Sequence, residues 1–478
     1  MNLKNALFFV YALITLVLFA TFRTNGIVWA SFFLSSSIVT GLVIFHIYFE
    51  KAYSPFLSAY IVFNFLFFIV APVIQLNSLE GIKPLMVNSF PYKEDLVIHT
   101  NVLISIFNSL FFIFYMFFKK RAKNRKPPTV KASSQKILPV TIIWLTGLSL
   151  IILVLSYQFV QDEIGRPSWQ KSVFSVSEIL IWKKVLFMTP FAGLILCFQY
   201  FSTKRKNAIN VVTIAAVLLL CLAIVFWFKN PFTEKRNALG PIYICILFLA
   251  YPKLLNSNIK SLSFLFFTLV VLFPLSAILT HTDASFQELI SDPSLLLEYN
   301  KGGGIATAFN TLNYDAFANI MATIEYVQHH GFAMGFQLLS ALLFFVPRGV
   351  WASKPISTGE QVGQYLIDDY GFTYNNLSNP MVSEGYINFG VFGVILLAGI
   401  LAYFLVFFIG WLKSEDYLKR IMAFYLAIHL IFLLRGDFTN GYTYYVGTFI
   451  GVLIIPRAVE FFIKQLLLNQ KKWKRLKT

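Results

Sequence analysis

Three arginines stand at the predicted ends of apolar helices and are the first candidates for chemistry. Arg236 lies in KRNALGPIY, Arg348 in VPRGVW and Arg435 in LLRGDF. A guanidinium binds phosphate oxygens through paired N–H donors, and Arg236 also stands where a helix N-terminus favours an anion. One such arginine taken alone is about equally well explained as an interfacial cation. Three around one vestibule predict a site for a diphosphate at the membrane surface.

Acidic residues supply the second half of such a site. Glu384, in SEGYINFG, comes directly before an apolar run, and a carboxylate at that boundary can have a raised pKa and act as a general base. Asp315 and Glu360 are the alternative bases, and Asp283 and the Asp368–Asp369 pair also compete. Most of these acids are expected to be solvated loop residues. Adjacent aspartates do not have a metal-binding spacing, so no metal site is predicted.

Aromatic residues are abundant in the same region, and most of them fit an interfacial belt. Sugar rings also stack on aromatic faces, so Trp351, Tyr374 and Tyr386 are candidate glycan-binding residues. The external histidines, His281, His329 and His330, show no metal-binding spacing such as HExxH. All three cysteines fall within apolar runs, which leaves no disulfide framework or CxxC pair.

Composition identifies the environment of these residues. The chain has 478 residues, of which 57% are hydrophobic and only 13% charged, which is typical of an integral membrane protein. Its net charge of +17 does not indicate nucleic acid, because most Lys and Arg fall in segments predicted to be cytoplasmic, including 119–136 and the C-terminal tail. The positive-inside rule therefore predicts both termini in the cytoplasm.

The apolar runs predict an all-α, polytopic membrane protein with about 12 transmembrane helices and one large external loop. Three regions follow: a transmembrane bundle at 1–280, the external loop at 281–386, and C-terminal helices with a basic tail at 387–478. The apolar stretch 334–346 is too short to span and predicts a half-buried or re-entrant helix within the loop. The predicted spans are 6–22, 27–49, 56–75, 97–118, 137–159, 183–201, 209–228, 238–256, 261–280, 387–409, 420–434 and 442–463.

Four features together resemble a known family. They are the late large loop, KRNALGPIYICILFLAYP, FFVPRGVWASKPISTGEQVGQYL, and the re-entry EGYINFGVFGVIL. The chain in these respects is similar to the bacterial oligosaccharide repeat-unit polymerases, the Wzy-type O-antigen and exopolysaccharide polymerases. The segment 344–397 carries the most specific likeness, and the spacing between Arg348 and Gly359 looks like a pattern in some members' loops.

The resemblance implies a glycosyltransferase of the C-type membrane architecture, without a cofactor, at the periplasmic face of a bacterial inner membrane. Its substrate would be an oligosaccharide on undecaprenyl diphosphate, and its partners membrane lipid, a chain-length regulator and a flippase. Arg236, Arg348 and Arg435, with Lys354, would hold the diphosphate, and Glu384 or another loop acid would activate the acceptor hydroxyl.

Three other functions stay open. A lipid-linked glycan transporter should carry charged residues near the bilayer midplane, whereas the ionisable residues here lie mostly at predicted helix ends. An O-antigen ligase-like transferase should show a histidine pattern that is not evident. A scaffold in an export complex would not need external arginines and acids.

Overall fold

The computed structural model describes residues 2–79, 83–85, 87–123, 137–164, 172–174, 176–202, 208–231, 234, 236–272 and 309–476. These residues form helices and connecting segments, with one isolated bridge between Pro84 and Pro91. The predictions for 124–136 and for 281–308, including His281 and Asp283, lie outside the described residues. The all-helical prediction is confirmed for the described part of the chain.

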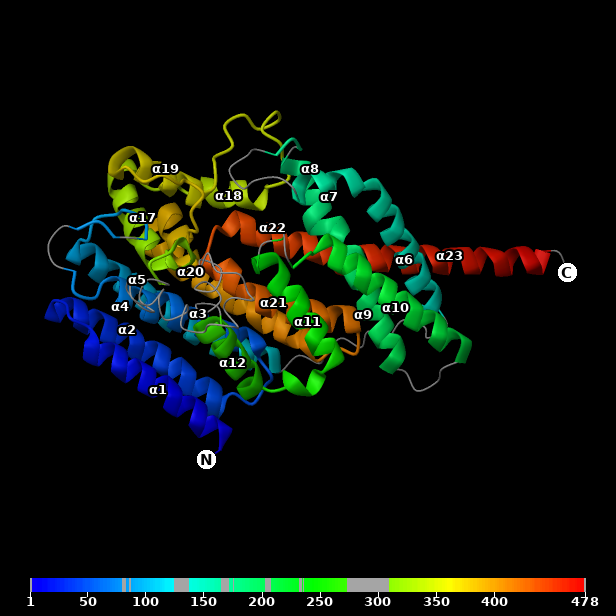
Figure 1. Ribbon diagram of the computed structural model, residues 1–478, viewed down its shortest axis with the longest axis horizontal. Coiled ribbons are helices and arrows are strands. Elements are labelled where there is room, and N and C mark those ends of the chain that lie inside the picture. The colour runs from blue at the N-terminus through cyan, green and yellow to red at the C-terminus, as the bar shows by residue number, and fades with distance from the viewer. Residues whose placement is uncertain are drawn as a thin grey trace, which may run out of the picture. The chain divides into compact units, whose positions relative to one another are not determined.

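The chain divides into two compact units (Figure 1). The first comprises Met1–Arg125, Lys253–Phe407 and Leu430–Gly441, and the second comprises Lys126–Pro252, Phe408–His429 and Tyr442–Thr478. Both units are discontinuous, and α20, α21 and α22 contribute residues to each. The first unit contains α1 (Leu3–Thr21), α2 (Gly26–Ile44), α3 (Pro55–Phe65), α4 (Ala71–Gln75), α5 (Glu94–Lys123), α12 (Asn258–Phe266), α17 (Ala316–His330), α18 (Phe336–Leu342), α19 (Thr358–Tyr370) and most of α20 (Met381–Leu412).

The second unit is built from the middle of the chain and its C-terminal helices. It contains α6 (Leu138–Leu155), α7 (Tyr157–Ile164), α8 (Val176–Leu180), α9 (Thr189–Ser202), α10 (Ala208–Phe228), α11 (Arg236–Ala250), most of α21 (Tyr417–Arg435) and of α22 (Phe438–Phe449), and α23 (Ile455–Leu476). Short π-helical and 3-10 segments join several helices within both units. The π-helical ones are Phe45–Phe49, Leu66–Val70, Ile181–Val185, Phe267–Leu272 and Ile450–Ile454, and the 3-10 ones are Leu186–Met188, Pro252–Leu254 and Leu312–Tyr314.

Ten helices of the described residues are long and apolar enough to cross a membrane. The protein is therefore a polytopic membrane protein, and its described residues contain ten such helices against about twelve predicted for the whole chain. The predicted spans 238–256 and 261–280 correspond to the shorter apolar helices Ala238–Ala250 and Asn258–Val270. The first helix ends early because Pro252 follows it. The second begins at Asn258, where Ser257 caps it by accepting from the Lys260 N–H, and residues 273–280 of its predicted span lie outside the described residues.

One central helix organises the first unit. In the span Pro55–Gln75, 94% of the apolar window is buried, whereas the corresponding value for α1 is 6%. Ser54 caps α3 by accepting from the Leu57 N–H, and Pro55 occupies its first turn, where no N–H is needed. In Figure 1, α2 and α5 run side by side around this centre, in agreement with their extensive contact.

A sharp break divides α20 near its start. Phe389 and Gly390 have non-helical backbone angles, and Gly390 has a positive φ of 60°. A Cβ placed on Gly385 would lie 2.7 Å from the carbonyl carbon of Gly393, although an unbroken helix would separate the two residues by about 12 Å. The chain therefore folds back at Gly390, and only two glycines allow this close approach. The first two turns of α20 consequently do not continue the direction of the long apolar part.

Candidate functional site

Glu384 lies on the short first part of α20, and its carboxyl is buried. The side chain is 2% exposed. Its Oε1 accepts a hydrogen bond from the Thr358 hydroxyl and another from the backbone N–H of Phe438, at 3.2 Å. The carboxyl thus connects α20 to the first residues of α19 and α22. This arrangement fits an anchoring role, and a catalytic role requires the covering residues to move.

A second carboxyl, missed in the sequence analysis, lies beside Glu384. Asp437 is 7% exposed, and a negative charge on it repels a negative charge on Glu384. Asp437 has a positive φ of 26° and caps α22 by accepting from the Thr439 N–H at 2.9 Å. Burial raises the pKa of the Asp437 carboxyl, although hydrogen bonds, first among them that from Ser357, oppose the rise. The two carboxyls are therefore expected to titrate together and not independently.

Helix ends surround this carboxyl pair and lessen its repulsion. Ser357 caps α19 by accepting from the Glu360 N–H, at 3.3 Å, so the positive end of α19 stands at the pair. The N-terminus of α22, with the Phe438 N–H, approaches from another side. Helix N-termini favour negative charge. The helix ends therefore favour a negative charge on this carboxyl pair.

Asp315 and Arg435 form a second charged pair in the same unit. The Arg435 guanidinium lies 3.4 Å from Oδ1 of Asp315 and also donates to the Leu312 carbonyl. Asp315 accepts further bonds from Ser378 and Asn319 and is 1% exposed. Burial raises the pKa of the Asp315 carboxyl, and the neighbouring guanidinium opposes the rise. The structure thus brings the predicted site residues Asp315 and Arg435 together, and it pairs them with each other as an ion pair.

The RGD segment 435–437 joins the two pairs. A Cβ on Gly436 would lie 2.4 Å from the backbone nitrogen of Asn379, so this glycine allows direct backbone contact with the segment before α20. Asn379 in turn accepts from Thr323 at 3.1 Å, and its buried Nδ2 has no partner among the described residues. Three buried acids and the partly exposed Arg435 are therefore gathered around the backbone contact between Gly436 and Asn379. We call the set Asp315, Glu384, Arg435 and Asp437 the acid cluster.

Arg348 and Lys354 occupy the loop between α18 and α19. Arg348 is exposed, and its guanidinium donates to the carbonyls of Lys354 and Pro355. The Lys354 ammonium donates to three backbone carbonyls at 2.9–3.0 Å, those of Leu343, Phe344 and Val346. All three ammonium donors are thereby used, which leaves Lys354 without a donor for a diphosphate. Arg348 keeps N–H groups for a ligand.

The remaining predicted residues are dispersed. Glu360 is half-buried in the first turn of α19, whereas Asp368 and Asp369 are exposed near its end. The backbone of Arg236 begins α11 in the second unit, and its side chain lies outside the described part.

The three candidate glycan-binding aromatics differ in exposure. Tyr374 is 44% exposed, and Trp351 is half-buried with its ring edge-on to Phe336 at 5.4 Å. Tyr386 is 8% exposed, with rings of His99 and Phe332 against it. In this conformation only Tyr374 and Trp351 offer ring surface to a sugar.

Glu325 forms a further polar site that the sequence analysis did not single out. Its carboxylate pairs with the Lys93 ammonium and accepts from the hydroxyls of Tyr365, at 2.9 Å, and Tyr370. Burial opposes ionisation, but the bonds from Lys93 and the two tyrosines prevail and lower the pKa of Glu325. This carboxylate is fully partnered and fixes α17 to α19, so it is better suited to structure than to proton transfer. In the sequence, Glu325 and His329 lie four residues apart, and this spacing does not predict the polar site around Glu325.

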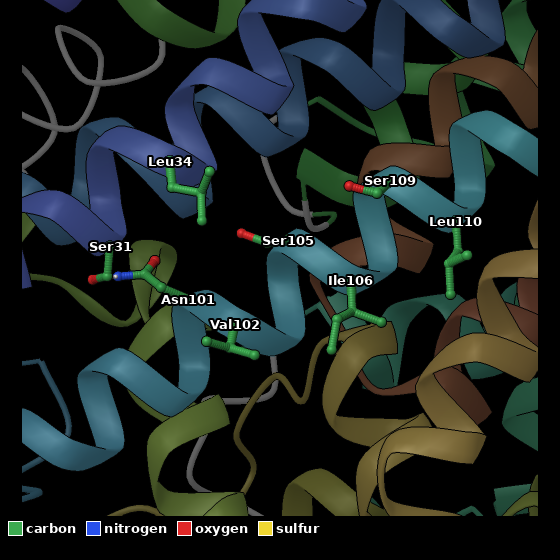
Figure 2. A pocket seen from close by; sticks show the side chains of 8 residues that line it. All are labelled: Ser31, Leu34, Asn101, Val102, Ser105, Ile106, Ser109 and Leu110. Carbon is green, nitrogen blue, oxygen red and sulfur yellow. Dashed lines mark hydrogen bonds between the residues drawn. The ribbon is translucent and has the colours of Figure 1, made fainter.

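A hollow of about 460 Å³ opens between α2 and α5 (Figure 2). Leu34 and Val102 form exposed apolar walls, and on its floor Asn101 donates to the Ser31 hydroxyl at 2.9 Å. Both helices are candidate spans. None of the residues lining the hollow belongs to the acid cluster, and we assign it no function.

Comparisons with known proteins leave the function open. No protein-family model, no curated protein sequence and no solved structure matches this chain. Function must therefore be argued from the residues and their geometry alone. Among the described residues no group of three or more His, Cys, Asp or Glu side chains is arranged to hold a metal ion.

Proposed function

We propose that this protein is a membrane glycosyltransferase that joins lipid-diphosphate-linked oligosaccharide units into a polymer. The observation that carries the proposal is the acid cluster. Three carboxyls and an arginine are held where α17, the start of α19 and the RGD segment meet residues 378–384. A buried polar cluster of this kind costs folding free energy, and perturbed carboxyls of this kind are typical of functional sites.

The chemistry needs a proton acceptor. The acceptor sugar's hydroxyl oxygen attacks the anomeric carbon of the donor, the bond to the diphosphate oxygen breaks, and the hydroxyl proton must leave. We assign this proton to the Glu384–Asp437 pair, because two interacting carboxyls can take up one proton between them. Ser357 is half-buried and hydrogen-bonds Asp437, which makes the turn 357–358 the cover that has to open for the substrate.

The leaving diphosphate needs positive charge where its own charge develops. Arg348 is suited to this, since it is exposed and only part of its guanidinium is used by backbone carbonyls. Arg435 is less suited, because Asp315 neutralises it. We therefore assign the diphosphate contact to Arg348, and the role of Arg435 to holding the cluster together.

The test is transfer of a labelled repeat unit between lipid-linked substrates by the purified protein in lipid nanodiscs. Polymer should form with the wild-type chain and should fail with Glu384→Gln, whose amide still accepts hydrogen bonds from Thr358 and Phe438. If Glu384→Gln forms normal polymer and Thr358→Val is also active, Glu384 serves only to anchor the helices. Absence of any transfer by the wild-type chain would reject the glycosyltransferase function.

One observation favours a transporter of lipid-linked glycan as the second candidate. Lys184 lies inside the candidate span Glu178–Ser202, where the helix changes to π and 3-10 form, and it is only 8% exposed. Buried charge on an irregular helix is common along transport pathways. A fluorescent lipid-linked glycan that crosses proteoliposome membranes without being polymerised would support this candidate over the transferase.

A further inference from the structure

The segment around α18 has its polar side chains inside and its apolar side chains outside. Gln337 and Ser340 are buried, with Gln337 bonded to Gln361 and Ser340 donating to the Pro355 carbonyl at 3.2 Å. Seven apolar side chains of the same segment, within residues 332–350, are between 43% and 79% exposed. We call them the apolar strip: Phe332, Met334, Phe336, Leu339, Leu342, Phe345 and Val350.

This orientation is unfavourable in water. A helix of a soluble domain turns its apolar face to the core and its polar face outward, and large exposed apolar patches mark contact with a protein, a ligand or a membrane. The inverted arrangement is favourable when hydrocarbon covers the outer face. The strip therefore indicates a hydrocarbon partner.

The strip adjoins the lipid-facing surface of α20. Phe332 packs on Gly390 at the break in that helix, and the Ala333 N–H donates to the Ile387 carbonyl at 2.8 Å. Directly after the break, Phe392 is 66% exposed on the long apolar part of α20. The exposed apolar surface of a candidate span thus continues onto the strip.

Both ends of this segment are also tied to the surroundings of Glu384. At one end Asn388 accepts from the Leu338 N–H at 3.4 Å and donates to the Glu384 carbonyl at 2.8 Å. At the other end the chain leads through residues 355–357 to Thr358, whose hydroxyl donates to the Glu384 carboxyl. A hydrocarbon chain lying on the strip would therefore lie beside the acid cluster.

We propose that the apolar strip receives the hydrocarbon chain of a polyprenyl diphosphate-linked substrate at the membrane edge. This inference rests on the proposed function. Arg348 is exposed between Phe345 and Val350 in the sequence, so it can meet the diphosphate at the end of the bound chain. The strip would then select lipid-linked glycans over soluble ones.

The kinetic test compares two donors with the same glycan, one on a long polyprenyl chain and one on a short chain. Leu342→Gln and Phe345→Gln should raise the half-saturating concentration of the long-chain donor roughly tenfold. They should leave transfer from the short-chain donor unchanged. The matched control is Leu16→Gln on α1, which is 66% exposed and lies outside the strip. Equal losses with both donors, or no loss with either, would overturn the inference.

A second measurement does not depend on activity. A photoreactive benzophenone amino acid at Phe345 should capture a long-chain polyprenyl diphosphate from phospholipid vesicles, and excess unlabelled polyprenyl diphosphate should prevent the capture. Capture of phospholipid alone would overturn the docking proposal. If the wild-type chain shows no transfer but does capture the polyprenyl chain, the proposed enzymatic function fails while the docking surface stands.

Discussion

Replacing Glu384 separates anchoring from proton transfer, because two substitutions affect the two roles differently. Glu384→Gln keeps an oxygen that accepts from the Thr358 hydroxyl and the Phe438 N–H, but its amide cannot take up a proton. Glu384→Ala removes the acceptor and leaves both buried donors unpaired. Each unpaired donor costs about 1–3 kcal/mol, so the alanine variant should lose about 2–6 kcal/mol of stability.

The glutamine variant should unfold at the wild-type temperature or slightly above it, because it removes one negative charge from beside Asp437. Its transfer rate should nevertheless fall roughly 10²–10⁴-fold, the usual loss when general-base catalysis is removed. Thermal unfolding in detergent gives the first quantity, and single-turnover transfer of labelled glycan gives the second.

Glu360→Gln is the matched control, since Glu360 is a half-buried acid on the adjacent helix turn. It should change neither quantity. Near-normal transfer by Glu384→Gln would refute the proton-transfer reasoning, and loss of transfer in Glu360→Gln alone would move the role to Glu360. A glutamine variant as unstable as the alanine variant would show that the charge itself holds the helices together.

Three further predictions concern neighbouring residues. Arg348→Ala should abolish polymer on a gel without lowering the unfolding temperature. Arg348→Lys should stay impaired, because an ammonium lacks the paired donors of a guanidinium. Polymer of normal length from Arg348→Ala would remove this residue from the site. Gly359→Ala places a Cβ 2.1 Å from a backbone carbonyl oxygen and should cost about 1–3 kcal/mol or more, whereas Gly349→Ala, with no atom within 4 Å, should be neutral. Asp437→Asn keeps the helix cap but cannot ionise. Because burial raises the pKa of Asp437, the wild-type chain loses stability as pH rises through the interval from the ordinary aspartate pKa to the raised one. The asparagine variant should therefore gain relative stability over that interval and none below it, and a pH-independent difference in unfolding temperature would contradict this.

Hydropathy was sufficient to predict most of the spans, because a helix in lipid must satisfy its own backbone and therefore needs a long apolar run. It predicted too long a span at 238–256, where the helix ends at Ala250 shortly before Pro252. It also could not show that α20 folds back at Gly390, since the angle of a break depends on what packs against it. The predicted span 387–409 is almost uniformly apolar, so its hydropathy does not mark the break.

The acid cluster was predictable in part. Glu384, Asp315 and Arg435 were recognised by residue type and by position at helix ends, but the pairing of Asp315 with Arg435 was not, because it depends on how segments 120 residues apart meet. Asp437 was overlooked because an aspartate after glycine is typical of a solvated turn. Its position at the start of an apolar run was the available signal, and it is the same signal that drew attention to Glu384.

The sequence separation within the acid cluster has a consequence for biogenesis. The contacts of Glu384 with Phe438 and of Asp315 with Arg435 join residues 54 and 120 positions apart. A ribosome synthesising the chain delivers both acids long before their partners at 435–438 emerge. Contacts between distant segments form late in folding, after the local helices exist. During translation the insertion machinery must therefore accommodate unpaired carboxyls at the membrane boundary, and only a chain synthesised past residue 438 can cover them.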